Sequence, residues 1–176
     1  MSVYPNSQKP QIEDIQIISL LPENWQKYKE LRLEILKNDY TPFAWTLEES
    51  LEFTDQKWQE MAISGHKRFA VKNNKLIGML DLVIGKTSKS AHLAVVISVY
   101  VNSEFRNQGI AKMLFEDIEK YAKNQGVEIL RLNVLVDNLP AKNLYKKLGF
   151  VKIGDLPKAM KHKNIYYNEI QMQKEI

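Results

Sequence analysis

The chain has 176 residues, of which 44% are hydrophobic and 26% charged, and its formal net charge at pH 7 is +4. This composition is typical of one soluble globular domain that is long enough to enclose a hydrophobic core. The chain contains no cysteine, which excludes disulfides, thiolate nucleophiles and thiolate metal sites. The expected location is therefore the cytoplasm. No apolar run approaches the roughly 20 residues that span a bilayer, so we expect no membrane segment.

Positive charge is concentrated near the end of the chain. Residues 138–176 carry eight lysines against three acidic residues. Such a balance could attract a polyanion, either nucleic acid or a phosphorylated cofactor, and a solvated lysine-rich face explains it equally well. No aromatic-interleaved basic motif supports nucleic acid, and three scattered histidines give no metal-ligand spacing. We therefore expect neither a nucleic-acid partner nor a metal site.

The chain is expected to open with a loose polar tail over Met1–Gln11. Alternation of apolar and polar residues then predicts a strand over Ile12–Leu20. Apolar residues at three- and four-residue steps predict a helix that begins at Pro22. A loop is expected over Asn38–Trp45.

A second helix is predicted by Thr46 and by Glu49 three residues later, the signature of a capping box. This helix is expected to run to about Met61. The hydrophobic period then changes to that of strands. The two strands expected here cover Arg68–Val71 and Leu76–Ile84.

The second half of the chain is expected to alternate strands and helices. Leu93–Val101 is almost continuously apolar, as expected of a strand covered on both faces. A helical stripe of apolar residues begins near Gly109. Asn138 is a candidate cap for a short helix with Pro140 in its first turn. The other strands are expected over Ile129–Val136, Phe150–Ile153 and Ile165–Met172.

This order of elements predicts a single α/β domain (α+β, mixed sheet) over residues 12–176. We expect a central twisted sheet of about six to seven strands with helices on both faces. Two strand–helix–strand units, over 93–136 and 129–153, should each form a right-handed crossover.

The turn between Val101 and Gly109 is the most informative stretch. Backbone N–H groups in the first turn of a helix have no partner within the helix, and the helix dipole is positive there. Gly109 lets the backbone approach a ligand closely, and Arg106 adds positive charge at the rim. These features predict a pyrophosphate site; the alternative is a turn that binds nothing, because a polar loop with one glycine before a helix is common. The lone glycine does not make a dinucleotide fingerprint, and no Gly-Lys-Ser/Thr follows as in a Walker loop.

Two motifs resemble those of the GCN5-related N-acetyltransferases, the GNAT family. Residues 106–111, Arg-Asn-Gln-Gly-Ile-Ala, are similar to its acetyl-CoA motif Arg/Gln-x-x-Gly-x-Gly/Ala. Val99-Tyr100-Val101 resembles the family's bulged strand. Residues 138–150 resemble its Asn-x-x-Ala-x-x-Leu-Tyr-x-x-x-Gly-Phe segment. The element order from about Ile12 to Met172 fits the family as well.

The resemblance implies a GNAT-like acyl-CoA N-acyltransferase fold and an enzyme. This enzyme would transfer acetyl from acetyl-CoA to a primary amine of a small molecule or peptide, by direct attack through a tetrahedral intermediate. It also implies that the strands 93–101 and 129–136 splay apart to admit the pantetheine arm. A backbone N–H near Val99 or Tyr100 would polarise the thioester carbonyl. The implied cofactor-binding residues are Val99, Tyr100, Val101, Arg106, Asn107, Gln108, Gly109, Ile110, Ala111, Asn138 and Tyr145.

Tyr145 is the candidate catalytic residue, because a phenol near the leaving thiolate can protonate it. The alternative is a tyrosine that only packs on its helix beside Leu144 and Leu148. Asn138 can be both a helix cap and a cofactor contact. The sequence leaves the general base open. Its candidates are His92, Glu48, Glu49, Tyr167 and Glu169.

Acceptor specificity is expected from the helix–loop–helix region and from a connection over Pro157–Asn164. The aromatic residues of that region are Tyr40, Phe43, Trp45 and Trp58. Of these, Trp58 has the helical spacing of a core residue. The acceptor could be a polyamine, an amino acid, an aminoglycoside-like antibiotic or a protein amine.

Two other functions stay open at this stage. One is a non-catalytic acyl-CoA-binding regulatory module, which a turnover assay would separate from an enzyme. The other is a nucleic-acid-binding domain, whose affinity would depend steeply on salt. Members of the family often pair through their last strands or helices, which makes a homodimer reasonable.

Overall fold

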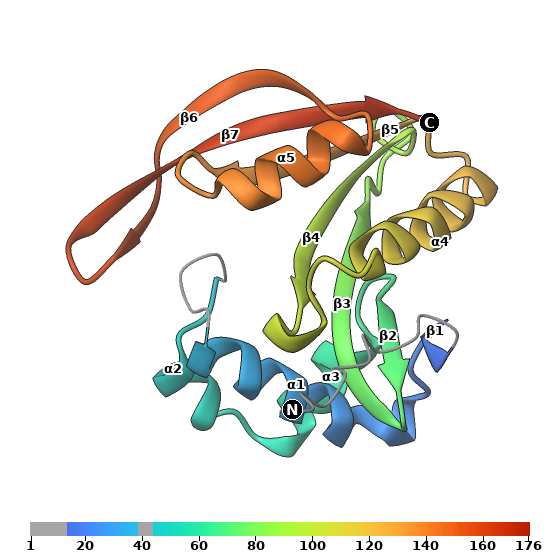
Figure 1. Ribbon diagram of the computed structural model, residues 1–176, viewed down its shortest axis with the longest axis vertical. Helices are drawn as coiled ribbons and strands as arrows, with labels where there is room; N and C mark the ends of the chain where they lie inside the picture. Colours follow the sequence, from blue (N-terminus) through green and yellow to red (C-terminus); the bar gives the residue numbers. More distant parts are fainter. Residues whose placement is uncertain (1–13, 39–43) are drawn as a thin grey trace, which may run out of the picture.

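The computed structural model describes residues 14–38 and 44–176; the predicted tail Met1–Gln11 lies outside them. Within these residues, seven strands form one sheet in the order β1-β2-β3-β4-β5-β7-β6 (Figure 1). The strands are β1 (Gln16–Ile18), β2 (Arg68–Lys72), β3 (Lys75–Ile84), β4 (Leu93–Val101), β5 (Ile129–Leu135), β6 (Val151–His162) and β7 (Ile165–Glu175). The helices are η2 (Pro22–Asn24), α1 (Trp25–Asn38), α2 (Leu47–Leu51), α3 (Asp55–Ile63), η3 (Ser103–Phe105), α4 (Ile110–Asn124) and α5 (Leu139–Lys147).

The sheet is mixed, as the sequence predicts. β4 and β5 are parallel neighbours joined through α4, and all other neighbouring strands are antiparallel. The second predicted unit also exists, from β5 through α5 to β6. In that unit β7 inserts between the two strands, so β6 becomes the edge of the sheet. No helix in the described part of the chain is both long and apolar enough to cross a bilayer.

Each face of the sheet carries its own hydrophobic core, which confirms the prediction of helices on both faces. Leu114 and Ile118 of α4 are fully buried in one core, together with Tyr145 of α5. Ile35 of α1 and Trp58 of α3 are buried in the other core. The cores lie on opposite faces because successive side chains of a strand point to opposite sides. Trp58, only 1% exposed, is therefore a core residue.

A β-bulge at Ser98 reverses the alternation by which the side chains of β4 point to the two faces of the sheet. Tyr100 opposes Met79 of β3 and Ile97 opposes Asp81, so β4 has one extra residue between these pairs. Ser98 has a φ of 55°, in the left-handed region. Before the bulge, Val96 faces the core under α4; after it, Tyr100 joins the core under α1. Regular alternation would have placed both on the same side.

The expectation that β4 is covered on both faces is wrong. Val95 and Ile97 are 40% and 41% exposed. The helices α1 and α3 cover this face of the sheet around Met79 and Tyr100, beyond the bulge. Ile97 instead lines two pockets.

The predicted helix from Thr46 to Met61 is two helices. Thr46 and Glu49 form the expected capping box, with bonds of 3.2 and 2.8 Å. The first helix ends at Leu51, and Thr54 starts the second by accepting the backbone N–H of Lys57 at 3.2 Å. A threonine side chain competes for backbone groups in this way and favours helix starts over helix interiors.

The predicted connection Pro157–Asn164 is mostly strand. β6 runs to His162 and turns back through Lys163 and Asn164. Pro157 lies within a register shift between Leu156 and Met160. An edge strand tolerates a proline there because that residue need not donate to a ladder. The resulting β6–β7 hairpin projects beyond the rest of the sheet (Figure 1).

Candidate active site

The parallel strands β4 and β5 separate after three residue pairs. They are in register over Leu93–Val95 and Ile129–Arg131, and no further pairs join them. β4 continues to Val101 and β5 to Leu135. The separated segments enclose a cleft of about 530 Å³. Main-chain groups on that side of β4 are therefore available to a ligand that extends the sheet. The predicted splay is present.

The first turn of α4 forms one end of the cleft. Gly109 precedes the helix with a φ of 81° and provides no side-chain cap. The first backbone bond into the helix runs from the N–H of Met113 to the carbonyl of Gly109, at 3.1 Å. The preceding N–H groups of Ile110, Ala111 and Lys112 thus lie ahead of the helical ladder. A Cβ placed on Gly109 would meet no atom within 4 Å, so the backbone is open to an anion there.

Arg106 is held at the rim of the cleft. Its Nε donates to the carbonyl of Val101 at 2.9 Å, and its guanidinium lies 6.0 Å from the centre of the Tyr100 ring. Asn107 has a φ of 62° and turns the chain toward α4. The side chain of Gln108 instead donates to the carbonyl of Glu104 at 3.2 Å, within the same turn.

Helix α5 and its N-cap line another wall of the cleft, and Asn138 and Tyr145 are the implied cofactor-binding residues among them. Asn138 accepts the backbone N–H of Ala141 at 3.2 Å and so caps the helix, as predicted. Tyr145 is 6% exposed and packs edge-on against Phe115 and Phe150. Burial raises the pKa of the Tyr145 phenol, so this side chain keeps its proton at neutral pH.

Most of the residues that the resemblance implied come together around this cleft. Gln108 lies outside the lining, because its side chain closes the turn. The lining includes the other ten, Val99, Tyr100, Val101, Arg106, Asn107, Gly109, Ile110, Ala111, Asn138 and Tyr145.

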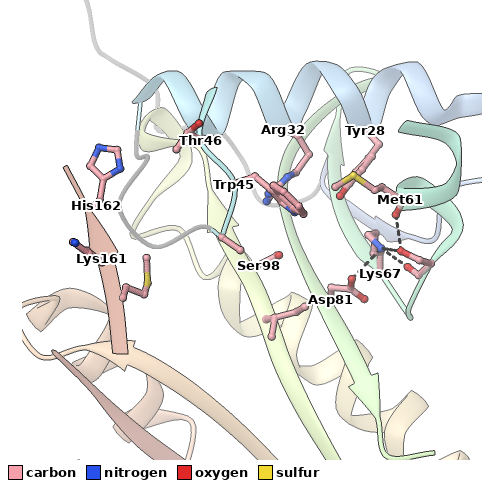
Figure 2. A pocket seen from close by; sticks show the side chains of 14 residues that line it. Tyr28, Arg32, Trp45, Thr46, Met61, Lys67, Asp81, Ser98, Lys161 and His162 are labelled. Carbon is pink, nitrogen blue, oxygen red and sulfur yellow. Dashed lines mark hydrogen bonds and ion pairs between the residues drawn. The ribbon is translucent and has the colours of Figure 1, made fainter. Parts of the chain in front are cut away.

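A second pocket, of about 590 Å³, lies on the side of the sheet that carries α1 and α3 (Figure 2). Ile97 and Ser98, at the bulge of β4, line both this pocket and the cleft. Trp45 lines it as the sequence suggested, and the end of β6 forms a wall through Met160, Lys161 and His162. Tyr40 and Phe43 lie outside the described residues.

Among the candidate bases, Glu169 of β7 lines the cleft. Burial raises the pKa of Glu169, while a hydrogen bond with Asn133 opposes this shift. The side chain of Glu49 is occupied as a helix cap. His92 and Tyr167 are in neither of the two pocket linings.

The sequence reasoning missed three charged residues of the second pocket, Arg32, Lys67 and Asp81. Arg32 could have been noticed, because it falls on the buried stripe of α1 between Leu31 and Ile35. Lys67 and Asp81 gave no signal, since their pairing depends on how β2 and β3 are aligned in space.

The two cavities suit two ligands that meet at the bulge. The cleft fits an elongated molecule with an anionic end at α4 and an arm that bonds to the main chain of β4. The second pocket would admit its reaction partner. Such an arrangement allows group transfer without a covalent intermediate on the protein.

Comparison with known proteins agrees with this geometry. A model of the acetyltransferase (GNAT) family matches residues 30–150. The L-amino acid N-acetyltransferase of Escherichia coli K12 is 31% identical over 101 residues, which are 55% of this chain and 62% of that protein. This chain therefore matches less than two thirds of that relative's length.

Solved structures show the same fold. The acetyltransferase of the GNAT family from Streptococcus pneumoniae has a TM-score of 0.80 at 18% identity, over 92% of this chain and 99% of that one. An acetyltransferase from Salmonella typhimurium, solved with its cofactor acetyl-CoA, has a TM-score of 0.74 at 14% identity. The similarity covers 92% of this chain and 94% of the Salmonella chain.

Gly109 is expected to be required for its backbone conformation. Gly109→Ala should lower the free energy of unfolding by about 1 to 2 kcal/mol, because alanine is strained in the left-handed region. Gly154→Ala is the control, since its Cβ also meets no atom within 4 Å and its φ is not left-handed. Urea unfolding of both variants measures the difference. Equal stabilities would contradict the assigned turn.

Proposed function

Because the chain belongs to the acetyltransferase (GNAT) family, we propose that it transfers the acetyl group of acetyl-CoA to a primary amine of a small molecule or peptide. The observation that carries this proposal is the meeting of the two cavities at Ile97 and Ser98. One cavity has the features of a cofactor cleft, and the other gives the amine a separate approach.

The residues present fit acetyl-CoA. The open space above Gly109 and the N–H groups of the first turn of α4 suit a pyrophosphate, and Arg106 adds a positive charge beside them. The main chain of β4 after Val95 suits the amide groups of the pantetheine arm. Acetyl-CoA supplies an acetyl group activated as a thioester. Main-chain N–H groups near the bulge, at Val99 or Tyr100, would stabilise negative charge on its carbonyl oxygen.

Tyr145 would donate a hydrogen bond to the leaving sulfur. Its raised pKa keeps the phenol protonated, and Tyr145 lines the cleft while its ring packs against Phe115 and Phe150. Burial also makes the phenol a weaker acid. A hydrogen bond donated to the developing thiolate is therefore the role that its environment favours, and the released thiolate takes its proton from water.

Glu169 is the group that we propose to accept the proton of the amine. An amine must be neutral to attack, and a lysine-like amine has a pKa of about 10.4 in water. Glu169 lies in the cleft, and burial brings its pKa nearer to neutrality. A carboxylate in such a position is a better base than one in water.

Two expectations remain part of this proposal. We place the protein in the cytoplasm. A chain without cysteine forms no disulfides and could carry out acetyl-CoA-dependent chemistry there. We also place a homodimer contact along β6, since this strand is the edge of the sheet and exposes Val151 and Ile153.

Replacement of Tyr145 by phenylalanine tests the assigned hydrogen-bond donor. Tyr145→Phe should lower kcat by about 10²-fold, because the hydrogen bond to the leaving sulfur is lost while the ring packing remains. Steady-state assays that detect thiol release would measure kcat, and calorimetry should show unchanged affinity for acetyl-CoA. Tyr166→Phe, at an exposed position of the hairpin, is the control. An unchanged kcat in Tyr145→Phe would contradict the role.

A parent protein that binds acetyl-CoA without any turnover across a panel of amines would support the regulatory module instead. That panel should include an amino acid, a polyamine, an aminoglycoside and a short peptide.

The pH dependence of kcat/KM tests Glu169. The carboxylate form is the base, so activity should fall as pH drops through the pKa of Glu169, which is raised above that of an ordinary glutamate. In the pH profile of kcat/KM, protonation of the amine causes a first break, and protonation of Glu169 should cause a second break at lower pH. Glu169→Gln should lose the second break and about 10²-fold in kcat/KM at neutral pH. Glu175→Gln, at an exposed position of the same strand, should keep the second break and the full kcat/KM. A second break that persists in Glu169→Gln would rule out this base.

A further inference from the structure

The second pocket has charged groups set into an apolar wall (Figure 2). Its apolar and aromatic lining includes Tyr28, Trp45, Met61, Ile97 and Met160. The charged side chains Arg32, Lys67 and Asp81 are only 5%, 8% and 6% exposed. Burying a charge is costly unless it is compensated, so a cluster of buried charges beside a cavity marks a candidate binding site.

Asp81 is compensated within the protein. The Nζ of Lys67 lies 2.9 Å from one of its carboxylate oxygens, and the backbone N–H of His66 donates to the other at 3.0 Å. Asp81 also acts on Arg32: burial lowers the pKa of Arg32, and Tyr28 and then Asp81 oppose this shift. These three side chains thus form one electrostatic cluster.

The described lining has more positive than negative charge. Asp81 is the one acidic residue among the described residues that line the pocket, against Arg32, Lys67 and Lys161. The hairpin that bears Lys161 adds Lys158 and Lys163, both exposed. A substrate that enters past this hairpin meets a positive surface, which favours an anionic group over a second amine.

We propose that the acceptor is an α-amino acid with an apolar side chain, and that Arg32 binds its carboxylate. This inference rests on the proposed acetyl transfer. A guanidinium binds a carboxylate through two parallel N–H···O bonds, which would orient the amine toward Ile97 and Ser98. The side chain would pack against Trp45 and Met61. A polyamine would instead bring further positive charge to a positive lining.

Matched pairs of acceptors test the carboxylate. L-Phenylalanine and L-methionine should be acetylated with a kcat/KM about 30-fold or more above those of L-phenylalaninamide and L-methioninamide. The amine of an amide loses its proton more readily than that of the free acid, so intrinsic reactivity favours the amides. A preference for the acids must therefore come from the protein.

Substitution of Arg32 assigns that preference to one side chain. Arg32→Gln should raise KM for L-phenylalanine and lower kcat/KM about 30-fold, with little change for L-phenylalaninamide. Arg32→Lys should restore part of the loss. Lys37→Gln removes an exposed charge from the same helix and should change neither substrate. Calorimetry with acetyl-CoA checks that each variant is folded. If Arg32→Gln does not fold, the comparison of acids with amides and the Arg32→Lys variant still decide the question.

The outcomes distinguish a failure of the acceptor assignment from a failure of the proposed acetyl transfer. Amides acetylated as well as the acids, or spermidine acetylated in their place, would overturn the acceptor assignment and leave acetyl transfer intact. Equal losses on acid and amide in Arg32→Gln would show a structural role for Arg32 and would overturn its assignment. Absence of both acetyl-CoA binding and transfer to any amine would defeat the proposed function, and the acceptor assignment with it.

Discussion

The loss of pairing between β4 and β5 after Val95 is the constraint on which the site depends. Unpaired main-chain groups inside a protein are costly unless something bonds to them, and a parallel sheet normally supplies that partner from the next strand. Here β5 separates from β4, and the cleft between them exposes the backbone of β4 to a ligand. The core under α4 still holds both strands, through Val96 and Leu132, so the gap is a stable feature of the fold.

The bulge at Ser98 determines how the two cavities meet at the end of this gap between β4 and β5. Because it inserts one residue opposite β3, Tyr100 anchors β4 in the core under α1 while Val99 and Val101 pack on the side of α4. The segment Ile97–Ser98 consequently borders both cavities. Asn102 fixes the next turn to α1 by donating to Glu34 at 2.5 Å. One local irregularity thus aligns the cofactor side and the acceptor side of the sheet.

Local signals in the sequence were enough for much of this arrangement. The turn before Gly109, the cap at Asn138 and the capping box at Thr46 each depend on residues a few positions apart, and all were predicted. Features that depend on spatial alignment were not. The hydrophobic run of β4 gave no sign that Ile97 would be exposed, and the strand beyond Pro157 depends on pairing with β7. The contact between Lys67 and Asp81 likewise requires the register of two strands.

The central claim is that the cleft between β4, β5 and the first turn of α4 binds acetyl-CoA. The most direct measurement is a calorimetric titration of the protein, of Gly109→Trp and of Gly154→Trp with acetyl-CoA. The indole at position 109 would fill the open space at the helix end, whereas position 154 lies on β6 away from the cleft. We predict binding to the parent and to Gly154→Trp, and none to a folded Gly109→Trp. Equal binding by all three proteins, or no binding by the folded parent, would contradict the account.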